Sequence, residues 1–191
     1  MSKKEKIREK YFKIRKNKYF EINNRFFKPV INLIKKKYKS KKINISTYYP
    51  SNFEVNTLKF LKTFNYKKVN FLLPIIKNKN ELFFVKWNIF DLLIVNRFGM
   101  LEPEPSKKTL VPDVALIPLL AYDSKNYRLG YGGGYYDKFL NKYLKKNKNI
   151  LTIGVAFSFQ KYKKLPISKY DVQMQYILTE KGLKKTWKFL L

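Results

Sequence analysis

Cysteine and histidine are both absent from the 191 residues of this chain. The lack of cysteine excludes disulfides, thiolate nucleophiles and zinc–thiolate sites. The lack of histidine excludes Ser-His-Asp triads, histidine-bound metals and imidazole general bases. Any chemistry must therefore come from carboxylates, cations, hydroxyl groups or the main chain itself.

Long apolar runs are missing as well, so no segment is expected to span a bilayer. The charged opening stretch MSKKEKIREKYFKIRK lacks the apolar centre of a secretory signal, and we expect a cytoplasmic protein that does not bind membranes. Hydrophobic residues make up 45% of the chain, enough for a real core. With no internal repeat and no dividing linker, residues 1–191 are expected to form one domain and to act as a monomer.

Acidic residues are scarce: there are 13 against 42 lysines and arginines, which gives a formal net charge of +29. Such a charge is typical of a protein that binds nucleic acid or another anionic surface. It also fits a proteome biased towards AT-rich codons, because Lys, Asn, Ile, Phe and Tyr are all abundant. The lysines are spread along the chain rather than gathered in one arm. We therefore favour the compositional explanation and expect no specific nucleic-acid partner.

Glycine is rare too, yet four of the seven glycines lie between Gly130 and Gly134. A buried strand is predicted upstream at Val114–Pro118, and a helix is predicted to start at about Tyr135. A glycine turn that leads into a helix presents free N–H groups and the positive end of the helix dipole, which together form an anion site. Arg128 adds a planar cation suited to phosphate.

This glycine segment does not match the nucleotide-binding motif G-x-x-x-x-G-K-[ST]. It does not match G-x-G-x-x-G either, because no glycine stands at the third glycine position of that motif. A tight strand-to-helix turn, with glycines for packing alone, is the alternative. Four glycines beside one arginine and a helix start favour the phosphate interpretation.

The stretch RLGYGGGYYDKFL, Arg128 to Leu140, follows a strand that ends IPLLAYD. It resembles the signature of the 5-formyltetrahydrofolate cyclo-ligase family, also called 5,10-methenyltetrahydrofolate synthetases. The resemblance implies an ATP- and Mg²⁺-dependent enzyme that closes 5-formyltetrahydrofolate to 5,10-methenyltetrahydrofolate and releases ADP and phosphate. It extends from the first predicted helix to the last predicted strand.

The resemblance also implies roles for residues of this segment. Arg128 and Tyr135 are implied as catalytic residues, and the tyrosines as rings able to pack on the pterin or adenine. The implied ATP contacts are Arg128, Leu129, Gly130, Tyr131, Gly132, Gly133, Gly134, Tyr135 and Tyr136. The implied folate contacts here are Tyr131, Gly132, Gly133, Gly134 and Tyr135.

A first helix is predicted over Lys3–Phe20 from apolar residues at helical spacing. Its predicted buried face is Ile7, Tyr11 and Ile14. Lys4 and Arg8 share another face and can clamp a phosphate chain, although a solvated basic face is the alternative in so basic a helix. KEKIR, Lys4 to Arg8, fits the K-x-x-x-R pair that contacts ATP in the family, so the resemblance favours ATP.

Ile43–Tyr49 alternates as a strand, and a helix is predicted at Glu54–Phe64 after a turn. Glu54 would then begin a helix beyond the carboxyl end of a strand, the edge where open α/β sheets bind ligands. Complementing the helix dipole is the alternative role. EVNT matches an E-x-x-T element that contacts folate in the family, and Tyr49 is also implied at the substrate.

The remaining elements follow from apolar runs and periodicity. Further strands are predicted at Val69–Ile76, Leu82–Trp87, Ile150–Phe157 and Tyr176–Leu178, and further helices at Arg25–Tyr38 and Lys181–Leu191. Because strands alternate with helices, we expect a Rossmann-like α/β fold, in which a largely parallel open sheet is flanked by helices in three layers.

The loop Gly99–Pro103 looks like the family's G-I-x-E-P element, which lies beside the folate, and Phe98 precedes it. In that position Phe98 would supply an aromatic wall. An ordinary proline-containing surface loop is the alternative, and the sequence leaves both interpretations open.

Two aspartates are candidates for a Mg²⁺ site, because Mg²⁺ commonly uses one or two carboxylates together with phosphate oxygens. Asp137 comes directly after the glycines, and stabilising the helix start is its alternative role. Asp171 ends LPISKYD, similar to a family segment whose aspartate joins the magnesium site. Lys169 and Tyr170 depart from the family, in which a histidine often precedes the aspartate, and an Asx turn is the alternative here.

Two other function classes stay open at this point. A basic nucleic-acid-binding module would use the charge and the 15 tyrosines, but the chain has no aromatic RNP-type strand, zinc motif or basic tail. A family member that has lost its activity is the second. The partner that the resemblance implies is 5-formyltetrahydrofolate, with or without a polyglutamate tail.

Overall fold

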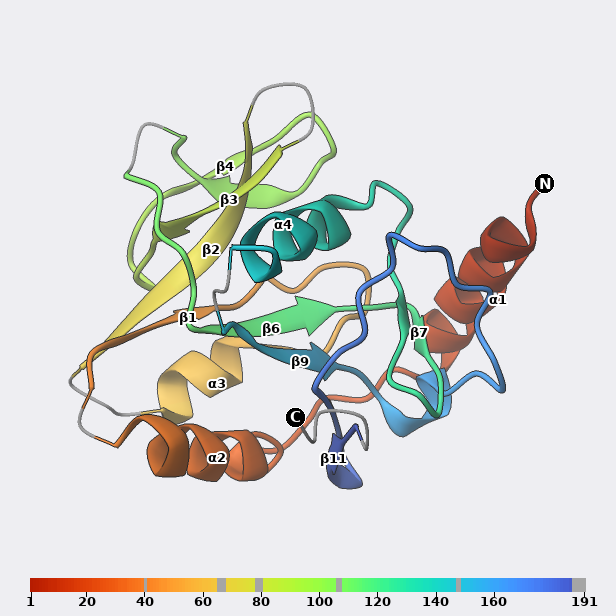
Figure 1. Cartoon of the computed structure of the whole chain (residues 1–191), viewed down its shortest axis with the longest axis horizontal. Helices are drawn as coiled ribbons and strands as arrows, with labels where there is room; N and C mark the ends of the chain where they lie inside the picture. Colours follow the sequence, from red (N-terminus) through yellow and green to blue (C-terminus); the bar gives the residue numbers. More distant parts are fainter. Residues whose placement is uncertain (40, 65–67, 78–80, 106–107, 147–148, 187–191) are drawn as a thin grey trace.

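The centre of the protein is a seven-stranded sheet in the order β11-β10-β9-β6-β1-β2-β3 (Figure 1). The computed structural model describes residues 1–191 except 40, 65–67, 78–80, 106–107, 147–148 and 187–191. The strands are β1 Ile43–Ser46, β2 Val69–Lys77, β3 Glu81–Lys86, β6 Val114–Pro118, β9 Leu151–Val155, β10 Tyr176–Thr179 and β11 Gly182–Lys185.

The sheet is parallel through its middle and antiparallel at both edges. β1 pairs in parallel with β2 and β6, β6 with β9, and β9 with β10. β3 and β11 run antiparallel to β2 and β10, because each follows its partner too closely in sequence for the crossover that parallel pairing needs. The prediction of a largely parallel α/β sheet flanked by helices is confirmed.

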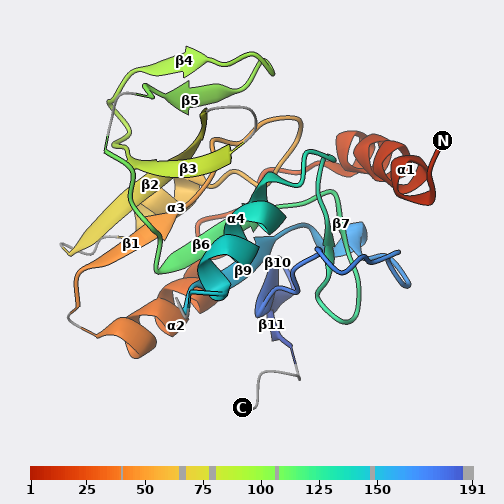
Figure 2. The same ribbon diagram turned by 45° about the horizontal axis from the view of Figure 1, so that its top comes forward.

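Helices cover both faces of the sheet (Figure 2). α2, Lys28–Tyr38, and α3, Leu58–Thr63, pack on one face, where Val30 and Ile34 meet residues of β1, β6, β9 and β10. α4, Tyr135–Leu144, packs on the other face, where Phe139 and Leu140 meet β2, β3 and β6. The central strands are therefore buried on both sides, as expected of a parallel sheet.

α1, Lys3–Lys18, stands beside the sheet rather than on a face of it (Figure 1). Its start is fixed by a capping box between Ser2 and Glu5. It packs against a short hairpin of β7, Ala121–Tyr122, and β8, Arg128–Leu129. Its buried residues are Ile7, Tyr11 and Arg15, so the face expected to include Ile14 is centred one residue later.

One predicted helix starts too early, and another is wrong. The helix predicted at Glu54–Phe64 is observed as α3, Leu58–Thr63. The chain turns at Asn52 and Phe53, which have φ of 48° and 62°, and residues 54–57 lie between this turn and the helix. The described part of Lys181–Leu191 contains the strand β11, and residues 187–191 lie outside the described residues. Gly182, at φ 113°, provides the tight turn that folds β11 back onto β10.

Other element bounds shift by a few residues. The first helix ends at Lys18 rather than Phe20, and the second begins at Lys28 rather than Arg25. The first strand ends at Ser46 rather than Tyr49. The loop predicted around Gly99–Pro103 contains β5, Leu101–Pro103, which pairs with β4, Leu93–Val95. None of the helices in the described ranges combines the length and the apolar character that a membrane crossing needs.

Candidate functional site

The site predicted from sequence lies at the carboxyl edge of the parallel strands. β1, β6, β9 and β10 point the same way, so the segments that follow them meet at one edge. In Figure 1, α1 and the β7–β8 hairpin stand at this edge. Ligands of open α/β sheets bind there, because the loops that leave the strands converge.

The glycine loop, residues 130–134, connects β8 to α4. Gly132 and Gly134 have φ of 121° and 66°, a left-handed region that side chains disfavour. Gly134 is the N-cap of α4 and has no side chain to cap the helix, so the first turn keeps N–H groups for another acceptor. Gly133 does not have positive φ, but a Cβ there would lie 2.3 Å from the Tyr135 ring.

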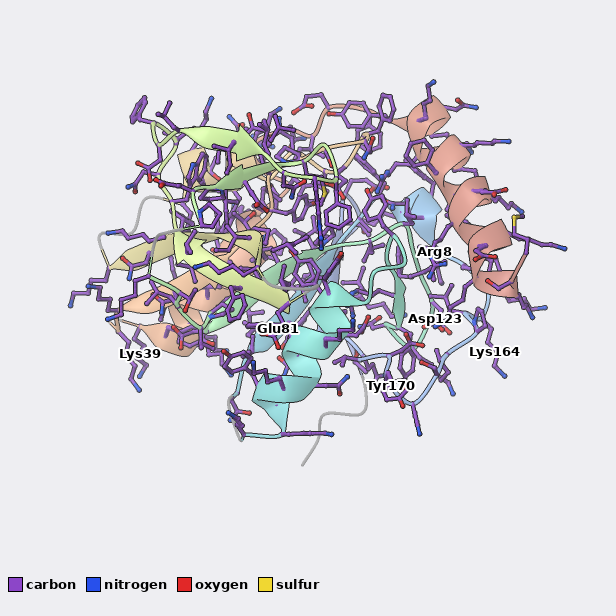
Figure 3. All side chains as sticks on the ribbon, turned by 90° about the horizontal axis from the view of Figure 1, so that it is seen from above. Arg8, Lys39, Glu81, Asp123, Lys164 and Tyr170 are labelled. Carbon is purple, nitrogen blue, oxygen red and sulfur yellow. The ribbon has the colours of Figure 1, made fainter. Side chains whose placement is uncertain are left out.

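The cation pair of α1 contacts this loop and its surroundings. The Arg8 Nε donates to the Gly130 carbonyl at 3.0 Å, and a Cβ on Gly132 would lie 3.5 Å from the Arg8 Cζ. The Lys4 Nζ lies 2.7 Å from Oδ2 of Asp171. Figure 3 shows Arg8 on the side of α1 that faces the body of the protein. The face of α1 that carries Lys4 and Arg8 therefore contacts the rest of the protein and is not wholly exposed to solvent.

The chain segments that carry the two candidate metal ligands are in contact. The Val172 N–H donates to Oδ1 of Asp137 at 3.0 Å, which places the residue after Asp171 at the start of α4. Oδ1 of Asp137 also lies 3.0 Å from Nη1 of Arg128. Oδ2 of Asp171 accepts from the Ser168 N–H, three residues earlier, at 2.6 Å, whereas the Asx turn suggested as its alternative role would use an N–H two residues later. The two segments together bring carboxylates and cations close to the glycine loop.

Burial alone would raise the pKa of Asp171, but the hydrogen bonds from Lys4 and Ser168 outweigh it, so the pKa is lowered. Asp171 is therefore ionised at neutral pH. Within the described residues, no cluster of three or more acidic, histidine or cysteine side chains could hold a metal alone. Two carboxylates with phosphate oxygens satisfy Mg²⁺, so the donor chemistry of Asp137 and Asp171 fits this ion.

Arg128 lies deeper than expected. Its side chain is 4% exposed, pairs with Asp137, and donates from Nη1 to the Val172 carbonyl at 3.3 Å. Tyr136 lies beside it, with its ring 6.0 Å from the Arg128 Cζ, and its buried hydroxyl has no partner among the described residues. Burial raises the pKa of Tyr136, with Glu54 adding to the rise. Arg128 and Tyr136 thus lie beneath the loop, and not on its outer surface.

Glu54 is joined to the glycine loop by a partly buried hydrogen bond. The Tyr131 hydroxyl donates to Oε1 of Glu54 at 2.7 Å, and Oε2 accepts from the Ser51 N–H at 3.0 Å. Burial raises the pKa of Glu54, and the charge of Arg15 offsets part of that rise. Glu54 does not begin a helix, but it does lie beyond the carboxyl end of β1, as the sequence indicated.

Aromatic side chains surround the same edge. The Phe98 ring lies 6.0 Å from that of Tyr135, so the β4–β5 hairpin reaches the glycine loop. The Tyr49 ring lies edge-on to the Trp87 ring, with the two ring centres 6.3 Å apart. Glu102 is buried and accepts from the Ile76 N–H at 3.3 Å, which ties the hairpin to β2. The segment is therefore an ordered hairpin beside the site.

Two hollows flank the Tyr131–Glu54 hydrogen bond. One, of about 340 Å³, is lined by Arg8, Glu9, Phe12, Lys13, Leu120 and Tyr131. The other, of about 290 Å³, is lined by Tyr19, Pro50, Ser51, Asn52, Phe53, Glu54 and Asn56. Tyr131 lines the first hollow and Glu54 lines the second, so the hydrogen-bonded pair Tyr131–Glu54 lies between the two hollows.

Sequence reasoning missed Arg15, which is 1% exposed and contacts Tyr131. The available signal was its spacing: Arg15 follows Ile7 and Tyr11 at intervals of one helical turn, on the apolar face. A cation at such a position is unusual and needs partners from elsewhere in the fold.

Comparison with known proteins identifies the family of the chain. The sequence profile of the 5-formyltetrahydrofolate cyclo-ligase family matches residues 1–180. The chain is similar to 5-formyltetrahydrofolate cyclo-ligases of Haemophilus influenzae (30% identity, covering 71% of this chain and 74% of the relative) and Mycoplasma pneumoniae (31%, covering 78% and 98%).

Among solved structures, the fold is similar to the 5,10-methenyltetrahydrofolate synthetase of Aquifex aeolicus. The TM-score is 0.74 at 28% identity, with 97% of this chain and 93% of the other covered. Since the family profile covers α1, the glycine loop, both aspartates and every strand of the central sheet except β11, the chain belongs to the 5-formyltetrahydrofolate cyclo-ligase family of enzymes.

Proposed function

We propose that the protein converts 5-formyltetrahydrofolate to 5,10-methenyltetrahydrofolate with ATP as the phosphoryl donor. The observation that carries the proposal is the meeting of Lys4, Arg8, the glycine loop and two aspartates at one sheet edge. This chain has no histidine or cysteine, so the site can align and neutralise reactants but offers neither an imidazole nor a thiolate.

The nucleotide phosphates would lie over the glycine loop. The first turn of α4 offers N–H groups that Gly134 does not cap, and α1 brings Arg8 to the same loop. Positive charge and main-chain donors together favour a phosphate at this helix start. Lys4 is close by, although it is now paired with Asp171. The loop residues Leu129, Gly130, Tyr131, Gly132, Gly133, Gly134, Tyr135 and Tyr136 remain the proposed ATP contacts.

The folate would lie on the side of Glu54, Tyr49 and Tyr135. Glu54 is buried and offers carboxylate oxygens, which accept hydrogen bonds from the N–H groups of a pterin ring. Tyr135 and Phe98 provide flat apolar surfaces at the same edge. The net charge of +29 favours approach of a polyanionic folate, including one with a polyglutamate tail.

The proposed reaction needs no protein nucleophile. The formyl oxygen attacks the γ-phosphorus and the bond to ADP breaks. N10 then attacks the formyl carbon, its proton is released, and the carbon–oxygen bond breaks to free phosphate. The chain aligns the two substrates and presents cations to the transferring group. Mg²⁺, held by Asp137 and Asp171, would supply further neutralisation of phosphate charge.

One assay tests the proposal directly. The purified protein is incubated with ATP, Mg²⁺ and 5-formyltetrahydrofolate, and methenyl product is followed by absorbance alongside ADP release. We expect product and ADP in equal amounts, and little ADP without the folate. A folded protein that forms no methenyl product would identify the chain as a family member without this activity, a possibility that Lys169 and Tyr170 raised.

A further inference from the structure

Arg15 is a buried cation to which neither the family resemblance nor the proposed reaction gives a role. It is 1% exposed and continues the buried face of α1 formed by Ile7 and Tyr11. Removing a guanidinium from water is costly unless hydrogen bonds compensate it. Its partners therefore indicate what it does.

The guanidinium divides its hydrogen bonds between two segments. Nη1 donates to the Leu119 carbonyl at 3.2 Å, just beyond the end of β6. Nη2 donates to the Tyr131 hydroxyl, and the Arg15 Cζ lies 5.4 Å from the Tyr131 ring centre. Nε is buried without a partner in the part of the chain that the structure describes. One end of Arg15 thus fixes α1 to the sheet, whereas the other acts on the glycine loop.

The contact with Tyr131 sets the direction of the next hydrogen bond. A tyrosine hydroxyl has one proton, and it accepts the bond from Arg15 on an oxygen lone pair. The proton is then available for Glu54, whose Oε1 lies 2.7 Å away. The Ser51 N–H holds the other oxygen of Glu54 at 3.0 Å. The carboxylate is thereby fixed from two sides.

This chain of contacts connects the two hollows. Tyr131 lines the hollow that also contains Arg8, and Glu54 lines the hollow formed by the turn after β1. Tyr131 is 46% exposed, although its hydroxyl lies between two buried charged groups. Arg15 therefore acts at the boundary between the proposed nucleotide and folate sides.

We propose that Arg15 is a positioning residue that, through the Tyr131 hydroxyl, orients Glu54 for the folate. The proposal rests on the proposed function and adds a folate-side determinant to α1, which otherwise supplies the nucleotide-side pair Lys4 and Arg8. The competing explanation is that Arg15 only attaches α1 through Leu119.

A double-mutant cycle separates these explanations. Arg15→Met removes the guanidinium and keeps an apolar stem, and Tyr131→Phe removes only the hydroxyl. KM for 5-formyltetrahydrofolate and KM for ATP are measured for wild type, both single variants and the double variant. Lys16→Met is the matched control, because it removes an exposed cation from the next position of the same helix.

We expect Arg15→Met to raise KM for the folate about tenfold, the loss typical of a hydrogen bond to a charged group, and to change KM for ATP much less. In the Tyr131→Phe background the same substitution should change the folate KM by less than about twofold. Lys16→Met should leave both constants unchanged. Calorimetry with 5-formyltetrahydrofolate alone gives the same comparison without turnover.

The outcomes distinguish the proposal from the function on which it rests. If wild type neither binds nor cyclises 5-formyltetrahydrofolate, both fail. If wild type is active and Arg15→Met raises KM for the folate and KM for ATP equally, the positioning role is overturned. The same conclusion follows if Arg15→Met raises KM for the folate equally in the wild-type and Tyr131→Phe backgrounds. Should Arg15→Met fail to fold, Tyr131→Phe decides alone, since an unchanged folate KM in that variant contradicts the proposal.

Discussion

At the scale of single residues, the role of Asp137 is still to be tested. Its carboxylate is the proposed Mg²⁺ ligand, yet Oδ1 already pairs with Arg128 and accepts from the Val172 N–H. The structure thus adds a third role to the two suggested by sequence, because the carboxylate holds a buried guanidinium in place. Removing its charge will have both a stability effect and, if it binds metal, a catalytic effect.

Asp137→Asn should separate these effects. The amide oxygen can still accept from Val172, but the charge opposite Arg128 is lost, so we expect unfolding free energy to fall by about 1–3 kcal/mol. A metal role predicts, in addition, a steep loss of turnover and a higher Mg²⁺ requirement. Turnover is measured across a Mg²⁺ titration, alongside urea unfolding.

Glu81→Gln is the control for Asp137→Asn. Glu81 faces Lys142 of α4 at 3.9 Å, and both side chains are about half exposed, so the change removes a similar charge at a screened site. Its Mg²⁺ dependence should match wild type. If Asp137→Asn loses stability but keeps wild-type turnover and Mg²⁺ dependence, Asp137 serves Arg128 and not a metal.

The glycine loop offers a matched pair of substitutions. A Cβ on Gly133 would lie 2.3 Å from the Tyr135 ring, whereas a Cβ on Gly130 would have nothing within 4 Å. Gly133→Ala should displace Tyr135 and lower ATP affinity at least about tenfold, and Gly130→Ala should change it little. Calorimetry with ATP and Mg²⁺ measures both. Equal affinities in two folded variants would contradict phosphate binding at Gly133.

Whether a site residue could be predicted from the sequence depends on how far its contact partners lie along the chain. Lys4 and Arg8 were chosen by spacing within one helix, and the structure brings both towards the glycine loop or its neighbours. Arg15 was missed because its partner Tyr131 lies 116 positions away. Arg128 was predicted as a site residue, but its burial depends on tertiary packing, which no local sequence pattern encodes.

At the scale of elements, local patterns predicted the strands that are buried on both faces. β6 is a continuous apolar run and β9 is one apart from Thr152, and both strands are almost wholly buried. The predictions were less accurate for elements away from the centre of the sheet, because the conformation of these elements depends on contacts with segments distant in sequence. Glu54 accepts from the Ser51 N–H and so stabilises the turn before it. Thr57 is the N-cap residue of α3, and its hydroxyl donates to the Tyr48 carbonyl at 2.5 Å.

β11 illustrates the same limit and has a role near the site. The Thr186 hydroxyl, after this strand, donates to the Met174 carbonyl at 2.7 Å and accepts from the Asn126 side chain. Asn126 has φ 62° in the turn that leads to β8 and the glycine loop. The last described strand therefore supports the turn that precedes the loop.

Thr186→Val should lower the unfolding free energy by about 1–3 kcal/mol, because the Asn126 amide and Met174 carbonyl lose a buried partner while volume is kept. Urea unfolding measures the change. Lys185→Gln, at an exposed neighbouring position, should stay within about 0.5 kcal/mol of wild type. A Thr186→Val protein as stable as wild type would show that water replaces both hydrogen bonds.

At the scale of the whole molecule, charge is the feature whose interpretation remains a prediction. If +29 reflects composition, nucleic acids should bind weakly, without sequence preference, and lose affinity steeply as salt rises. Filter binding of several DNA and RNA sequences at low and physiological salt tests this. Tight, selective binding at physiological salt would revive the nucleic-acid interpretation.

The two ion pairs beside the glycine loop have a consequence for the order in which ligands arrive. Lys4 is paired with Asp171 and Arg128 with Asp137, so each proposed metal ligand faces a cation. Mg²⁺ alone must compete with these groups, whereas a phosphate that draws Lys4 away leaves Asp171 free for the ion.

Metal and nucleotide should therefore bind with positive heterotropic cooperativity. Thermodynamic linkage requires each to raise the affinity of the other by the same factor, and coupling of this kind is typically about 5- to 150-fold. Calorimetric titrations of Mg²⁺ with and without ATP, and of ATP with and without Mg²⁺, measure the two factors after correction for binding between the ligands themselves. Lys4→Met, which releases Asp171 in advance, should bind free Mg²⁺ more tightly and show weaker coupling than wild type.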